Sequence, residues 1–125
     1  EHMRKAMSAM AWNQDLITDE LVAMRLKACQ RPGALDHFHR LFPPPRQRWL
    51  DAQCLPIGAL QQIDHEVLIV HGRDDRVVDP QVSWNLHQHL RNSQLHLIGN
   101  CGHWTMIEQG VRFRRLVAEH LLEES

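Results

Sequence analysis

The stretch VLIVHGRDDR, residues 67–76, is the strongest indication of the fold class in this sequence. It opens with four consecutive apolar residues, three of them β-branched, a run typical of a strand that is buried on both faces. His71 and Gly72 end the strand, and the charged residues behind them predict a loop at its carboxyl end. Because such a strand needs helices on both sides, residues 67–70 predict a parallel sheet in an α/β protein.

The residues that follow this strand continue the α/β pattern. Asp79 and Pro80 predict the start of a helix that runs to about Arg91, because Asp is a good N-cap and proline fits the first turn. Residues 94–98 predict a second short strand, and residues 108–123 a final amphipathic helix. We expect the two strands to lie parallel, with the helix as a right-handed crossover.

The first 55 residues lack any β-branched run and predict helices joined by polar turns. We expect these helices over about residues 3–12, 19–29 and 34–42. Thr18 is the expected N-cap of the second helix. The apolar stripe expected on that helix consists of Leu21, Met24, Leu26 and Cys29. We therefore divide the chain into a helical segment, residues 1–55, and an α/β segment, residues 56–125.

Composition argues against several classes of function. The chain has 14 basic and 15 acidic residues and a net charge of −1, which argues against a nucleic-acid partner. The longest apolar run is far shorter than a membrane span, and no basic-then-apolar leader opens the sequence. Three cysteines without a CxxC pair predict free thiols in a reduced, cytoplasmic protein; they are Cys29, Cys54 and Cys101.

Two predicted strands are too few for a stable parallel sheet. An open edge beside residues 67–70 leaves backbone groups unpaired and apolar surface exposed to water. No third strand of comparable quality is present. We therefore expect the chain to be the C-terminal piece of a larger α/β protein, and expect it either to form homo-oligomers or to associate with the missing N-terminal part.

Two chemically active side chains follow the two predicted strands. Asp75 lies in the loop after the first strand, and His103 lies in the loop after the second. Because carboxyl ends of parallel strands gather at one sheet edge, the two side chains are expected to meet. The carboxylate then accepts from imidazole Nδ1 and leaves Nε2 as a general base, which is the acid–base part of a catalytic triad.

These motifs resemble a known family, the meta-cleavage product hydrolases, which are α/β-hydrolases. The resemblance rests on HGRDDRVV at residues 71–78, on CGHW at residues 101–104 with Glu108 and Phe113 behind, and on NQDLITDEL at residues 13–21 with Arg25. It covers nearly the whole chain. One departure is Asp79, which stands where the family usually has proline.

The resemblance implies a fold and a reaction. The fold is the C-terminal part of an α/β-hydrolase, incomplete by itself: a helical cap over residues 1–55 and a βαβα unit of the parallel sheet over residues 56–125. The reaction is cleavage of a carbon–carbon bond in a 2-hydroxy-6-oxo-dienoate, a small-molecule ring-fission product of aromatic degradation. Neither a cofactor nor a metal is implied.

The resemblance also assigns residues. Asp75 matches the triad acid and His103 the triad base, while Arg25 matches the cap arginine that meets the substrate carboxylate. Trp104 and Val77 match positions that line the pocket. The family's nucleophile is a serine in a GxSxG motif upstream of the cap, and no serine of this chain has that setting. The chain alone is therefore expected to be inactive.

Several alternatives stay open on the sequence. An esterase, an epoxide hydrolase or a dehalogenase shares the HGxxD motif and the terminal histidine, and a non-catalytic interaction module is the option outside the enzymes. Asp74 has the wrong register for the triad and is interpreted as a turn residue. Cys101 is a conceivable substitute nucleophile, but we interpret it as a small buried turn residue. The spaced histidine pairs at residues 37 and 39 and at residues 87 and 89 are interpreted as surface residues, not metal ligands.

Overall fold

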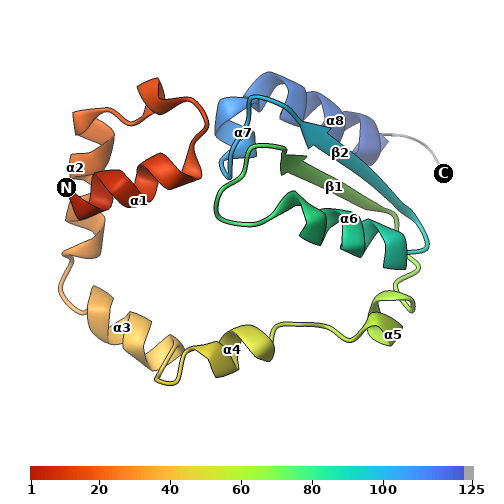
Figure 1. The fold of residues 1–125 in the computed structure, drawn as a ribbon, viewed down its shortest axis with the longest axis horizontal. Helices are drawn as coiled ribbons and strands as arrows, with labels where there is room; N and C mark the ends of the chain where they lie inside the picture. Colours follow the sequence, from red (N-terminus) through yellow and green to blue (C-terminus); the bar gives the residue numbers. More distant parts are fainter. Residues whose placement is uncertain (123–125) are drawn as a thin grey trace.

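The computed structural model describes residues 1–122. Helices occupy the first half of the chain, and two strands with further helices occupy the second (Figure 1). The elements, in chain order, are α1 (His2–Met10), the 3-10 helix η1 (Gln14–Leu16), α2 (Asp19–Cys29), α3 (Ala34–Leu41), α4 (Gln47–Asp51), α5 (Ile57–Leu60), β1 (Val67–Gly72), α6 (Pro80–His89), β2 (Ser93–Ile98), α7 (Thr105–Glu108) and α8 (Gly110–Leu122).

The two strands form a parallel pair. Val67 lies opposite Ser93, and Gly72 lies opposite Ile98, so both strands end at the same edge. The helices α6 and α8 lie on opposite sides of this pair (Figure 1). On the α8 side, Ile98 packs with Leu116 and with Cys101 from the loop that follows β2. The predicted βαβ unit, with helices on both sides of the strands, is confirmed.

The helix after β1 begins as predicted. Asp79 Oδ1 accepts a hydrogen bond from the Gln81 amide at 2.9 Å, and Pro80 occupies the first turn. The helix ends at His89, two residues before the predicted end, because Leu90 turns extended and is buried.

The single helix predicted over residues 108–123 is wrong at its start. The structure has two helices, α7 and α8, that are separated by Gln109 in a non-helical conformation. Glu108 closes α7 and uses its side chain to bind neighbouring loops rather than to begin a helix. Glu123 lies outside the described residues.

The helix α2 confirms its predicted start but not its predicted stripe. Thr18 Oγ1 accepts a hydrogen bond from the Leu21 amide at 3.1 Å. Only the first turn packs, with Leu21 against the cluster of Met7, Ala11 and Ile17. Met24 and Leu26 are 58% and 43% exposed, and neither packs on this cluster among residues 1–122.

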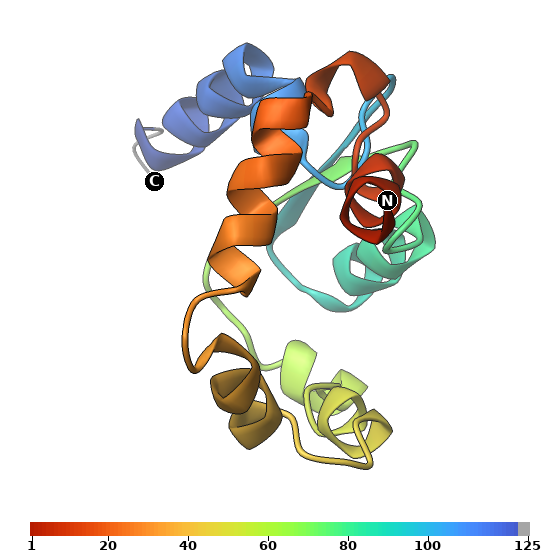
Figure 2. The same ribbon diagram turned by 90° about the vertical axis from the view of Figure 1, so that its left-hand side faces the viewer.

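The helices α4 and α5 were not predicted, since each is too short to show a periodic pattern. The four helices from α2 to α5 contain no fully buried residue. Figure 2 shows α2 leading down to α3 and α4, which lie apart from the strands. No helix within residues 1–122 is both long and apolar enough to cross a membrane.

Candidate active site

The loops that follow β1 and β2 lie side by side at the carboxyl edge of the strands. The Arg73 amide donates to the Ile98 carbonyl at 2.8 Å, and the Asp74 amide donates to the Cys101 carbonyl at 2.9 Å. Asp74 Oδ2 in turn accepts from the Cys101 amide at 3.3 Å. Asp74 is thus engaged in holding the two loops together, in keeping with its interpretation as a turn residue.

Gly72 makes this close approach of the loops possible. A Cβ atom at this position would lie 2.1 Å from the Gly102 carbonyl oxygen and 2.5 Å from the Cys101 carbonyl oxygen. Both contacts are with backbone, which has little freedom to move away. The glycine is therefore required by the packing of the second loop against the end of β1.

The two loops bring Asp75 and His103 together. His103 Nδ1 lies 2.9 Å from Asp75 Oδ2. The Asp75 side chain is only 3% exposed, while the His103 side chain is 36% exposed. Because an ionised carboxylate only accepts, Nδ1 carries the proton and Nε2 is left with its lone pair. Within residues 1–122 no hydrogen bond occupies Nε2, so this atom is available to take a proton from a reacting group.

The environment of Asp75 keeps its carboxyl ionised. Burial by itself raises the pKa of Asp75, but the Val78 amide, the His103 ring and the Val77 amide lower it more strongly, so the pKa lies below its ordinary value. Oδ1 accepts from the Val77 amide at 2.7 Å and from the Val78 amide at 3.0 Å. At neutral pH Asp75 is therefore an anion that orients the His103 ring.

A second histidine contacts the same carboxylate. His71 Nε2 lies 3.1 Å from Asp75 Oδ2 and 3.2 Å from the Val78 carbonyl oxygen. The other ring nitrogen, Nδ1, lies 2.5 Å from Oγ of the buried Ser83 on α6. The sequence analysis predicts no role for His71 beyond the end of the strand. The available signal was its position, four residues before Asp75 at the end of a buried strand.

Glu108 ties the His103 loop to the segment after α1. Its Oε2 accepts from the Gly102 amide at 2.6 Å and its Oε1 from the Asn13 amide at 2.8 Å. The His103 amide also donates to the Met10 carbonyl at 2.7 Å. The loop that carries the candidate base is thus fixed to residues that lie some 90 positions earlier in the chain. No local sequence pattern predicts these contacts.

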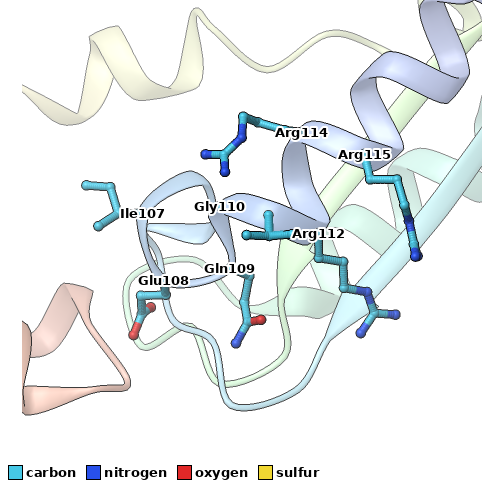
Figure 3. Close-up of a pocket in the computed structure, with 8 residues that line it drawn as sticks. Ile107, Glu108, Gln109, Gly110, Arg112, Arg114 and Arg115 are labelled. Atoms are coloured by element: carbon cyan, nitrogen blue, oxygen red, sulfur yellow. The ribbon is translucent and has the colours of Figure 1, made fainter.

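A hollow of about 710 Å³ lies along α7 and the first turns of α8 (Figure 3). Neither Asp75 nor His103 lines it. The Glu108 carboxylate points away from the guanidinium groups of Arg112, Arg114 and Arg115 in this view. We therefore assign Glu108 the role of binding backbone amides, and not that of an ion-pair partner for the arginines of α8.

Trp104 packs on the helical segment. Its half-buried side chain contacts the cluster of Met7, Ala11 and Ile17, which joins α1 to the turn before α2. The residue next to the candidate base is therefore part of a small apolar core. A position on the pocket wall, as the resemblance implies, remains a prediction.

The other two residues expected to bind substrate are exposed. Arg25 lies on the surface of α2 and forms no ion pair within residues 1–122. Val77 is 48% exposed. Its neighbour Val78 lines a small cavity of about 250 Å³ beside the candidate pair. The other residues around this cavity are Val70, His71, Asp75, Ser83, His103 and Thr105.

Cys101 is buried in the turn after β2, as predicted. Its exposed fraction is 0%. Burial raises the pKa of the Cys101 thiol; the Thr105 hydroxyl lowers it, and the negative charge of Glu108 raises it further, so the net pKa lies above its ordinary value. A thiol that stays protonated at neutral pH is a poor nucleophile, which removes the main argument for Cys101 as a substitute.

The histidine pairs considered as metal ligands are dispersed. His37 and His39 lie on α3, and His87 and His89 lie on α6. His87 Nδ1 is 2.8 Å from Ser93 Oγ and is engaged there. Across residues 1–122, no three His, Cys, Asp or Glu side chains are grouped so as to hold a metal ion.

Comparison with known proteins places this geometry in a family. The family model described as "alpha/beta hydrolase fold" matches residues 30–109. A 2-hydroxy-6-oxo-2,4-heptadienoate hydrolase of Pseudomonas putida is 47% identical over 123 residues, covering 98% of this chain and 45% of the relative. A 2-hydroxymuconate semialdehyde hydrolase of a Pseudomonas species is 40% identical over 121 residues, covering 97% of this chain and 43% of the relative.

The comparison with solved structures finds proteins of the same kind. The meta-cleavage product hydrolase CumD from Pseudomonas fluorescens superposes with a TM-score of 0.92 at 43% identity, covering 97% of this chain and 44% of that one. This chain thus spans less than half the length of the relatives that it matches. The match of the family model over most of the chain, together with the parallel strands and their paired loops, shows that the chain belongs to the α/β-hydrolase fold family.

Proposed function

We propose that the protein carrying this chain hydrolyses a carbon–carbon bond in 2-hydroxy-6-oxo-dienoates, which are ring-fission products of aromatic degradation. The observation that carries the proposal is the hydrogen bond of 2.9 Å between His103 Nδ1 and Asp75 Oδ2, with Nε2 left free for chemistry. This arrangement favours hydrolysis by an activated nucleophile. The choice of substrate class is supported by the names of relatives that are 40–47% identical over nearly the whole chain.

Each member of the pair has a distinct role in this proposal. His103 Nε2 takes the proton of the attacking group and returns it to the fragment that leaves. Asp75 holds the ring in the correct tautomer and stabilises the imidazolium that forms, without itself taking the proton. The dienol first becomes a ketone, and the nucleophile then adds to the distant carbonyl. Fragmentation of the carbon–carbon bond releases the hydroxydienoate and leaves the other fragment as an acyl group on the nucleophile. Water then hydrolyses this acyl group, which releases the acid and restores the nucleophile.

The nucleophile is the missing part of this mechanism. Within residues 1–122, Ser83 contacts His71 instead of His103, and no serine is hydrogen-bonded to the candidate base. We propose that a serine comes from sequence outside this chain, which is supported by relatives more than twice its length. Residues 1–125 alone are therefore inactive in this proposal.

We further propose the division into a helical cap, residues 1–55, and a part of the hydrolase core, residues 56–125. It is supported by the change from helices to strands after α5. Arg25 of the cap binds the substrate carboxylate, while Trp104 and Val77 line the pocket. The protein works in the cytoplasm, a proposal supported by three free cysteines. It associates with further copies or with the sequence that supplies the nucleophile.

The first experiment measures the turnover of a dienoate and of a neutral ester by the full-length protein. Asp75→Asn and His103→Ala are expected to lower kcat by on the order of 10³-fold or more, with the histidine change at least as severe. An Asp75→Asn variant with near wild-type kcat would contradict the triad assignment. Ester turnover without dienoate turnover would favour an esterase.

The second experiment tests the substrate carboxylate site. Arg25→Gln is expected to raise KM and lower kcat for the dienoate while sparing the ester, because only the dienoate offers a carboxylate to a guanidinium. Arg112→Gln on α8 is the control, since it removes an exposed arginine from outside the cap. Equal damage to both substrates would make Arg25 a structural residue and weaken the dienoate assignment.

A further inference from the structure

One oxygen of Asp75 lies between two imidazole rings. Oδ2 accepts hydrogen bonds from His103 Nδ1 at 2.9 Å and from His71 Nε2 at 3.1 Å. His71 belongs to β1, whereas His103 follows β2. The His71 side chain is 11% exposed, so its ring is shielded from water far more than that of His103. The mechanism proposed above uses only one of these two rings.

The hydrogen bonds of His71 define its tautomer. Nε2 faces Asp75 Oδ2 at 3.1 Å and the Val78 carbonyl oxygen at 3.2 Å, and both of these groups only accept. Nε2 therefore carries a proton, which it shares between the two. At the other side of the ring, Nδ1 lies 2.5 Å from Ser83 Oγ on α6. The ring is thus held at both nitrogens, by two different elements.

We propose that His71 is a positioning residue for the acid–base pair. Fixed by Ser83, it donates to Asp75 Oδ2 and keeps that oxygen directed at His103. The amides of Val77 and Val78 donate only to the other oxygen, Oδ1. Without His71, the buried Oδ2 therefore has a single donor, and the carboxylate has more freedom to rotate. The proposal relies on the proposed function only for the assignment of Asp75 and His103 as the acid–base pair.

A purely structural role for His71 makes a different prediction. In that case the ring merely ties β1 to α6 through Ser83, and any side chain that keeps the Ser83 contact preserves activity. If His71 positions Asp75, activity depends instead on a donor at the place of Nε2. Two amide side chains separate these cases, because an asparagine amide reaches about the place of Nδ1 and a glutamine amide reaches about the place of Nε2.

The experiment compares His71→Gln with His71→Asn in the full-length protein. We expect His71→Asn to lower kcat at least about tenfold with KM changed less than about twofold, because a misdirected base affects the chemical step rather than binding. We expect His71→Gln to stay within about threefold of the wild-type kcat. In substrate-free protein, the downfield N–H proton resonance of His103 should persist in His71→Gln and broaden or disappear in His71→Asn.

The matched control is His87→Asn. His87 on α6 makes a similar bond to a serine, with Nδ1 2.8 Å from Ser93 Oγ, and it has no contact with Asp75. We expect this variant to leave kcat and the His103 resonance unchanged. Equal kcat values and equal resonances in His71→Asn and His71→Gln would overturn the proposal, as would an equal loss of kcat in His87→Asn.

The two proposals fail in different ways. If the wild-type protein does not turn over the dienoate, the proposed function is wrong. The resonance of His103 needs no substrate, so its comparison between His71→Asn and His71→Gln still decides the role of His71. If the dienoate is cleaved and both variants keep full kcat and the resonance, only the positioning role is wrong.

Discussion

At the scale of single residues, Asp75 is the acceptor around which the site is arranged. Its two oxygens receive two backbone amides of its own loop and the rings of His71 and His103. The amides come from the turn after β1, whereas the rings come from the strand itself and from the neighbouring loop. A local turn and a tertiary contact therefore both stabilise the anionic form of a carboxyl that is nearly buried.

This anion makes the stability of the protein depend on pH. The folded-state pKa of Asp75 lies below its unfolded-state value, so the stability from its ionised form is fully present above about pH 4. That contribution is lost as the pH falls through the folded-state pKa. We expect Asp75→Asn to flatten the fall in unfolding free energy as the pH decreases below about 4, measured by urea unfolding of the full-length protein.

The control for this experiment is Asp36→Asn. Asp36 is an exposed residue of α3 that lies outside the two loops. We expect this variant to reproduce the wild-type pH dependence. A wild-type slope in Asp75→Asn would mean that the depressed pKa does not contribute to acid unfolding.

At the scale of elements, α7 connects the site to the helical segment. Glu108, its last residue, binds the Gly102 amide on one side and the Asn13 amide on the other. Because a charged acceptor forms the stronger kind of hydrogen bond, this contact helps to set the position of the His103 loop.

We expect Glu108→Gln to lower the free energy of unfolding by about 1–3 kcal/mol, because an amide nitrogen cannot accept from a backbone N–H. The expected kcat is lower as well, since the His103 loop is less well held. Glu119→Gln is the matched control: Glu119 forms an exposed pair with Arg115 on α8, and such pairs contribute about 0–1 kcal/mol. Chemical unfolding and dienoate kinetics of both variants test this, and equal stabilities would contradict it.

The end of β1 offers a second test at this scale. Gly72→Ala places a Cβ 2.1 Å from the Gly102 carbonyl oxygen, so the two loops must separate. We expect a loss of about 3 kcal/mol, at the upper end for overpacking. At Gly58 in α5 an added Cβ meets nothing within 4 Å, and Gly58→Ala should be neutral or stabilising by up to about 1 kcal/mol. Thermal unfolding of the two variants should therefore differ clearly.

At the scale of the whole molecule, β1 has one strand neighbour among residues 1–122. Beside it lies an open groove of about 430 Å³ between β1 and α8. The apolar residues that line this groove are Val67, Leu68, Val70, Phe113, Val117 and Leu121. An unpaired strand edge next to apolar surface is a template for association.

We therefore expect residues 1–125, expressed alone, to form dimers or larger assemblies at micromolar concentration. Sedimentation velocity measures this directly, with Val70→Lys as a variant that places a charge in the groove and should reduce association. A monodisperse particle of 14.6 kDa that unfolds cooperatively would contradict the expectation and favour an independent module.

Much of this architecture is determined by local sequence. The apolar run at residues 67–70 is enough to predict β1, and Asp79 with Pro80 is enough to predict the start of α6, because strand burial and helix capping act over a few neighbouring residues. The same holds for Thr18 at the start of α2. The meeting of Asp75 with His103 is also predictable, since parallel strands end at one edge.

The remaining contacts depend on how distant parts of the chain pack together. The apolar residues of α2 do not reveal which of them pack on the α1 cluster. The exposure of an apolar side chain depends on which distant element packs against it. Glu108 ends α7 with its carboxylate bound to the nearby Gly102 amide and to the Asn13 amide, which lies 95 positions earlier in the chain, and no local pattern encodes the second partner. From local sequence, His71 is likewise only the end of a strand. It becomes part of the site because α6 and the Asp75 loop pack around its ring.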